Sequence, residues 1–207
     1  MIMKKVAFII LSIVLLAACN DGQKKEAKVE EVAVNTTEVK GELPELSIYN
    51  LPATWTTQNY EDIQLEDLRG NVLVMVMIYT SCKAACPRLI ADMRNIEKQV
   101  PEEYLDKTKF IMVSIDPETD TPEKLNAFAK ENEMEDDHWI FLRGTLEDTR
   151  EFATVLAVSY KKISPIDFSH SNIISIFDEE GVLVHQQEGL GVDNTETVEA
   201  IKTEVSN

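Results

Sequence analysis

The chain has 207 residues, with 20 basic and 37 acidic side chains and a formal net charge of −17 at pH 7. Nucleic-acid-binding proteins neutralise phosphates with Lys and Arg, so this acidic balance excludes nucleic acid as a partner. About 165 residues follow the first 42 residues, and this is a normal size for one domain with one core.

The first residues have the layout of a signal peptide. Lys4 and Lys5 precede an apolar run over residues 6–18, which is shorter than the roughly 20 residues that a membrane-spanning helix needs. The run ends in the sequence LAAC, and small residues before Cys19 resemble the bacterial lipobox. That resemblance implies cleavage before Cys19 and attachment of lipid to its sulfur; the alternative is an ordinary signal peptide with an incidental cysteine.

These features divide the chain into three parts. We predict a lipoprotein signal peptide over residues 1–18, a flexible tether over residues 19–42 that starts at the lipidated Cys19, and one domain over residues 43–207. The tether is expected to be flexible because its composition follows no helical or strand period. The protein is therefore predicted to be exported and anchored to a bacterial membrane through lipid, facing the periplasm or the cell exterior.

The first half of the domain contains a predicted hairpin and two buried strands. Residues 46–68 combine short strand-like stretches with turn residues, which predicts an N-terminal hairpin. Residues 72–79 (VLVMVMIY) are apolar without alternation, which is typical of a strand buried on both faces in a parallel sheet. A helix is predicted over residues 86–99 and a second buried strand over residues 110–115.

The second half continues the alternation of helices and strands. Thr121 and Pro122 provide the cap and first residue of a helix that runs to about residue 132. The further predicted elements are a strand at 139–142, a helix at 145–156, strands at 171–177 and 182–186 around a turn at 178–181, and a helix at 195–205. This order predicts an α/β protein whose central mixed sheet is flanked by helices, which is the thioredoxin fold with additional elements.

Two cysteines mark a candidate site. Cys82 and Cys86 follow the first buried strand, at the edge where ligands gather in open α/β sheets. If the segment forms a first helical turn, their spacing places both sulfurs on one side. A helix N-terminus favours the thiolate, which is both a nucleophile and a metal ligand. A disulfide between them would close a very small loop and stabilise little, so we favour a redox couple or a metal site over a structural disulfide.

Two further motifs are expected near the cysteines. Asp116 and Asp120 follow the second buried strand, so they should lie at the same edge, where they either hold the loop or face the site. Helix capping and turn formation are an equal alternative for Asp120. His170 precedes a strand that should pair near the cysteine loop, whereas His138 and His185 are interpreted as surface or packing residues.

Taken together and in this order, the motifs CKAACP at 82–87, DPETDTP at 116–122 and DFSHS at 167–171 resemble the SCO/SenC family of copper-binding thioredoxin-like proteins. The likeness covers residue 43 to the end. It implies a thioredoxin-like fold and a copper ion held by two cysteines and one histidine. It also implies that the protein delivers copper to, or reduces, the copper centre of cytochrome c oxidase. The implied partner is the copper-site subunit of that oxidase or another cuproprotein.

The residue types favour copper on chemical grounds as well. Two thiolates and the His170 imidazole form a soft set of three ligands, which suits copper, whereas structural zinc normally takes four protein ligands. Met75 and Met77 alternate along the first buried strand and are interpreted as core residues rather than ligands.

Two other functions use the same cysteine pair. The first alternative is an extracytoplasmic thiol–disulfide reductase, in which Cys82 and Cys86 are the redox pair and His170 has no necessary part. Dedicated oxidoreductases of this fold more often space the pair by two residues. The second is a peroxide-reducing thiol enzyme, whose usual Thr or Pro before a single attacking cysteine is not found here. Whether the protein is an enzyme therefore stays uncertain, and we favour a copper metallochaperone that can also have thiol–disulfide oxidoreductase activity.

Overall fold

The computed structural model describes residues 41–82 and 86–207. The predicted signal peptide, the lipid anchor at Cys19 and all but the end of the predicted tether lie outside the described residues. Residues 41–207 form one compact unit. Among the described residues, none of the helices has both the length and the apolar character needed to cross a bilayer.

The described chain contains nine strands, five α-helices and two short 3-10 helices. The strands are β1 (Thr54–Thr57), β2 (Asp62–Gln64), β3 (Val72–Ile78), β4 (Thr108–Ser114), β5 (Trp139–Arg143), β6 (Tyr160–Ser164), β7 (Asp167–His170), β8 (Ile173–Phe177) and β9 (Leu183–Glu188). The helices are η1 (Ile48–Asn50), η2 (Leu65–Leu68), α1 (Cys86–Gln99), α2 (Glu102–Leu105), α3 (Pro122–Glu131), α4 (Leu146–Val155) and α5 (Thr195–Val205).

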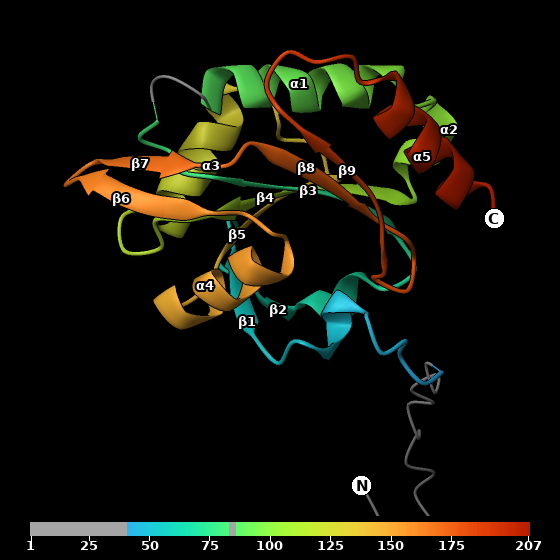
Figure 1. Cartoon of the computed structure of the whole chain (residues 1–207), viewed down its shortest axis with the longest axis horizontal. Coiled ribbons are helices and arrows are strands. Elements are labelled where there is room, and N and C mark those ends of the chain that lie inside the picture. Colours follow the sequence, from blue (N-terminus) through green and yellow to red (C-terminus); the bar gives the residue numbers. More distant parts are fainter. Residues whose placement is uncertain (1–40, 83–85) are drawn as a thin grey trace, which may run out of the picture. The chain divides into compact units, whose positions relative to one another are not determined.

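The main sheet is mixed, and its strands lie in the order β2-β1-β5-β4-β3-β8-β9 (Figure 1). Strands β3, β4 and β5 are parallel, while the outer strands pair antiparallel. The register pairs Ile78 with Ser114, so β3 and β4 end at the same edge of the sheet. The predicted thioredoxin-like fold, including the N-terminal hairpin β1–β2, is confirmed.

The core explains why the apolar pattern predicted these elements. All seven residues of β3 are buried, and Met75 and Met77 belong to that core as expected. Helices α1 and α5 lie together on one face of the sheet, and α4 lies on the other (Figure 1). Helix α4 buries Phe152, whose ring meets the Trp55 ring of β1 edge-on at 5.4 Å. Strand β3, which leads to the two cysteines, therefore lies in a sheet that is covered by helices on both faces.

One pair of strands is absent from the sequence-based prediction. Strands β6 and β7 form a separate two-stranded antiparallel sheet, which extends away from the main sheet (Figure 1). His170, expected from the sequence only to precede the late strand β8, is the last residue of β7. The predicted caps of α3 and α4 are confirmed, since the Thr121 and Thr145 hydroxyls accept hydrogen bonds from the amides of Lys124 and Asp148.

Candidate metal centre

The two cysteines lie where β3 gives way to α1. Cys82 follows the end of β3 by four residues, and its amide donates to the Tyr79 carbonyl at 3.2 Å. Cys86 is the first residue of α1. Because β3 is held in the middle of the sheet and α1 packs against it, both cysteines are placed by the most buried part of the molecule.

The two sulfurs have different surroundings. The Cys86 side chain is fully buried and Cys82 is partly exposed, and both are thiols. The Cys86 amide donates to the Cys82 Sγ at 3.2 Å, and the Cys86 Sγ lies 3.7 Å from the Tyr79 carbonyl, to which its S–H donates. An amide at the start of a helix stabilises negative charge on the Cys82 sulfur.

Burial opposes the thiolate that the helix start favours at Cys86. Burial raises the pKa of this thiol far above its ordinary value, and the neighbouring Cys82 and Asp120 raise it further. Desolvation penalises the charged form more than the helix start favours it, so Cys86 must lose a proton before its sulfur can bind a metal ion.

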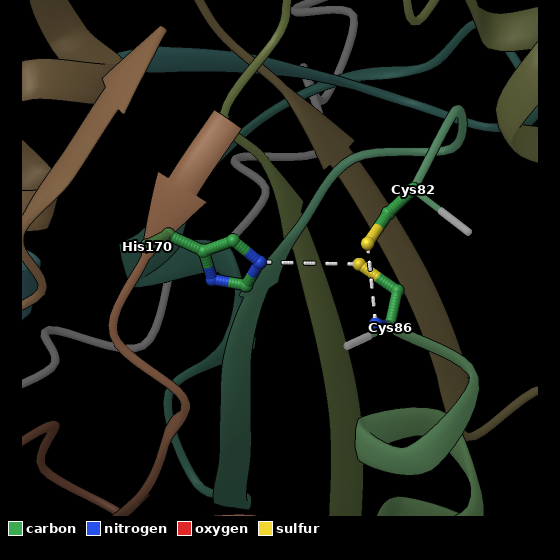
Figure 2. A group of neighbouring side chains, drawn as sticks. All are labelled: Cys82, Cys86 and His170. Carbon is green, nitrogen blue, oxygen red and sulfur yellow. Dashed lines mark hydrogen bonds between the residues drawn. The ribbon is translucent and has the colours of Figure 1, made fainter. Parts of the chain in front are cut away.

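The third predicted residue, His170, meets the cysteines from the β6–β7 hairpin. Its Nε2 lies 4.0 Å from the Cys86 Sγ, and the imidazole points across the site toward the two sulfurs (Figure 2). One ligand atom from each of Cys82, Cys86 and His170 lies within 4.8 Å of the other two. The structure therefore brings together the three side chains that the sequence singled out.

A backbone contact determines which nitrogen of His170 can act as a ligand. The Nδ1 lies 2.9 Å from the Ser171 carbonyl oxygen. A carbonyl can only accept, so Nδ1 carries the hydrogen and Nε2 keeps its lone pair. Burial lowers the pKa of His170, which favours the neutral ring. The unprotonated Nε2 is the atom that faces Cys86, as a metal ligand requires.

Tyr79, at the end of the β3 run, makes contacts that sequence reasoning missed. Its hydroxyl donates to the Asp167 carboxylate and accepts from the Phe168 amide at 3.3 Å. Its ring lies 5.1 Å from the Phe168 ring and 5.8 Å from the His170 ring, centre to centre. Tyr79 therefore ties the hairpin to the sheet. The sequence signal that could have revealed these contacts is the polar hydroxyl of Tyr79, which follows an otherwise apolar strand.

The two aspartates lie at the predicted edge but outside the sulfur–imidazole group. Asp120 accepts hydrogen bonds from the Thr80 hydroxyl at 2.5 Å, the Thr80 amide at 3.2 Å and the Ser114 hydroxyl at 2.6 Å. It therefore links the ends of β3 and β4 and supports the cysteine loop. Asp116 is buried in the same loop, where its carbonyl accepts from the amides of Thr119 and Asp120.

The other two histidines have their own partners elsewhere. His138 Nε2 lies 2.6 Å from a Glu97 carboxylate oxygen, and His185 Nε2 lies 3.0 Å from the Thr197 hydroxyl. Neither belongs to the group formed by Cys82, Cys86 and His170. Two sulfurs and one neutral imidazole nitrogen at this edge suit a soft metal ion, and the same two thiols can also form a disulfide.

Both a family model and a curated protein match the sequence of this domain. The family model for SCO1/SenC matches residues 47–206. A curated relative, the SCO1 protein homolog of Bacillus subtilis (strain 168), is 30% identical over 147 residues, which cover 70% of this chain and 75% of the relative.

Solved structures show the same fold. The SCO1/SenC family lipoprotein from Bacillus anthracis str. Ames is 27% identical with a TM-score of 0.67, over 73% of this chain and 91% of that one. BsSco is a member of the Sco family of cytochrome c oxidase assembly proteins, and a disulfide switch has been identified in it. It is 25% identical with a TM-score of 0.67, over 76% of this chain and 94% of that one. Bradyrhizobium japonicum ScoI with copper bound is 24% identical with a TM-score of 0.62, over 73% and 96%, and shares the fold.

Proposed function

The chain belongs to the SCO1/SenC family, and we propose that it binds a copper ion through Cys82, Cys86 and His170. One observation carries this proposal: two sulfurs and an imidazole lie within 4.8 Å of one another, with the lone pair of the imidazole directed at the sulfurs. Such a soft set of donors suits copper. A protein of the same fold, Bradyrhizobium japonicum ScoI, has been solved with copper bound, which supports the choice of ion.

The proposed role is to serve the copper centre of cytochrome c oxidase, either by delivering copper or by reducing the cysteines of that centre. Support comes from BsSco, which belongs to a family of cytochrome c oxidase assembly proteins. The partner would be the copper-site subunit of the oxidase or another cuproprotein. Both roles use the same thiols, because a site made of two cysteines must be reduced before it can bind copper.

The proposal places the protein outside the cytoplasm, attached to a membrane through lipid on Cys19. Support comes from the lipobox-like sequence and from the similar lipoprotein of Bacillus anthracis. Mass spectrometry of the purified wild-type protein should show lipid attached to Cys19, and the Cys19→Ser variant should carry no lipid. If the native protein carries no lipid, the predicted anchor is wrong.

The copper proposal is tested with the full chain, purified in detergent and kept reduced without oxygen. Titration with Cu(I) against a competing chelator should give one tightly bound copper per chain. The His170→Ala variant should bind at least tenfold more weakly, and the Cys82→Ser and Cys86→Ser variants should lose the site. His185→Ala is the matched control, because His185 contacts Thr197 away from the sulfurs. Wild-type affinity in His170→Ala would disprove the assignment of the third ligand.

The second candidate function is a thiol–disulfide reductase acting on another substrate protein. The observation that favours it is the adjacency of two thiols, one of them partly exposed, together with the disulfide switch of BsSco. Reduction of a protein disulfide should then survive in His170→Ala and disappear in Cys82→Ala. Turnover that requires His170 would contradict a function based on the thiols alone.

A further inference from the structure

A second group of metal-ligating side chains lies at the opposite end of α1 from the cysteines. Glu97, Asp136 and His138 each offer a ligand atom, and the three atoms lie within 4.8 Å of one another. Glu97 follows Cys86 by 11 residues on the same helix, which corresponds to about 16 Å along the helix axis. This group is therefore separate from the site described above.

Two of the three side chains are held in place by the core. The Glu97 carboxylate accepts from the Trp139 indole nitrogen at 2.8 Å and lies 2.6 Å from His138 Nε2. The His138 ring meets the Phe110 ring edge-on, with 5.7 Å between centres. The side chains of His138 and Glu97 are only 14% and 15% exposed. An outer hydrogen bond that orients a ligating carboxylate is a usual feature of metal sites.

The third side chain and the space around it remain open to solvent. Asp136 is exposed, and its carboxylate accepts no hydrogen bond from the described part of the chain. Together with Glu97 and His138 it lines a cavity of about 590 Å³, which leaves room for water to complete a coordination sphere. The acidic run EDD at residues 135–137 adds negative charge that attracts cations.

We propose that Glu97, Asp136 and His138 bind a divalent transition-metal ion such as Zn²⁺. Three protein ligands plus water is a common arrangement for zinc. A ligand set of one imidazole and two carboxylates suits Zn²⁺ better than Cu(I). The ion takes the place of the hydrogen between His138 Nε2 and Glu97. Ligands of one zinc ion lie about 3.3 Å apart, so the present 2.6 Å contact between His138 Nε2 and Glu97 must open by about 0.7 Å. His138, interpreted from the sequence as a surface or packing residue, thereby becomes a ligand.

The sharpest test uses Asp136, because the alternative interpretation gives it no role. If the group is only a hydrogen-bonded histidine and glutamate, Asp136→Asn changes nothing beyond the surface charge. If it is a metal site, Asp136→Asn weakens Zn²⁺ binding at least tenfold. Asp137→Asn is the matched control: it removes the same charge from the neighbouring exposed residue, and it should weaken binding less than threefold.

The experiment is a calorimetric Zn²⁺ titration of the full chain in detergent, with all three cysteines replaced by serine so that sulfur takes no part. We expect one bound Zn²⁺ per chain, and no saturable binding in His138→Gln. If the serine substitutions impair folding, the wild-type chain is first loaded with Cu(I) and then titrated. Absence of saturable binding, or equal effects of Asp136→Asn and Asp137→Asn, would overturn the proposal. Neither result bears on the proposed copper site, because its Cu(I) affinity is measured separately.

Discussion

The cysteine half and the histidine half of the candidate copper site are supported in different ways. Cys82 and Cys86 are placed by β3, α1 and the buried Asp120. His170 is placed by the two-stranded β6–β7 hairpin, in which every residue is exposed or only partly buried. One half of the site therefore shares the stability of the core, whereas the other depends on a few contacts, chiefly those of Tyr79.

The strongest effect is expected in the cysteine half. Replacing Asp120 by Ala leaves the Thr80 amide and the hydroxyls of Thr80 and Ser114 without their acceptor. Because buried unsatisfied groups are costly, the free energy of unfolding should fall by about 3–5 kcal/mol. Denaturant unfolding measures this loss. The control is Glu118→Ala in the same loop, where the side chain is exposed; an equal loss in both variants would show that Asp120 does not support the loop.

Bound copper should reduce the difference in stability between the cysteine half and the histidine half of the candidate site. Cu(I) that binds only the folded chain stabilises it by about 2.7 kcal/mol when its free concentration is a hundredfold above its dissociation constant. If His170 is a ligand, the ion also links the hairpin to α1. Amide hydrogen exchange in β6 and β7 should then slow on copper binding. In His170→Ala the hairpin amides should exchange at the metal-free rate, and slowing in that variant would contradict the link.

A smaller effect is expected at the contact between the halves. A double-mutant cycle with Tyr79→Phe and Asp167→Ala isolates the hydrogen bond between these residues, which should contribute about 1 kcal/mol at this partly exposed position. Both variants should also weaken Cu(I) binding, because His170 is less well held. The control is the hydrogen-bonded pair Thr56–Asp62 at the far edge of the sheet, whose disruption should leave copper affinity unchanged.

The weakest effect is expected at the tip of the hairpin. Ile166 is 73% exposed, so Ile166→Ala should change the free energy of unfolding by no more than about 0.5 kcal/mol. The same substitution at Ile174 of β8, which is 1% exposed, should cost about 2–5 kcal/mol because it leaves a cavity. Similar losses at both positions in thermal unfolding would mean that the hairpin is part of the core.

The elements predicted well were those with a strong burial pattern. The continuous apolar run of β3 and the helical periodicity of α1 are directly visible in the sequence, because both elements bury a large apolar surface in the core. The caps at Thr121 and Thr145 are equally local signals. These elements position the two cysteines, so that half of the site followed from the sequence.

The elements that were missed contain no such signal. Strand β6 (YKKIS) has no buried face, and β7 (DFSH) is only four residues long. The turn between them contains Pro165, a typical turn residue that offered the one available sign. The raised pKa of Cys86 also could not be predicted, because it arises mainly from burial of the thiol in the folded protein.

The contact between His170 Nδ1 and the Ser171 carbonyl has a consequence for how this site varies among sequences. The acceptor is a main-chain oxygen, so any amino acid at position 171 supplies it as long as the backbone follows the same path. The tautomer of the imidazole is thus encoded by chain geometry instead of by residue identity. Conservation of side chains around the histidine would therefore underestimate how strictly the position of its ring hydrogen is constrained.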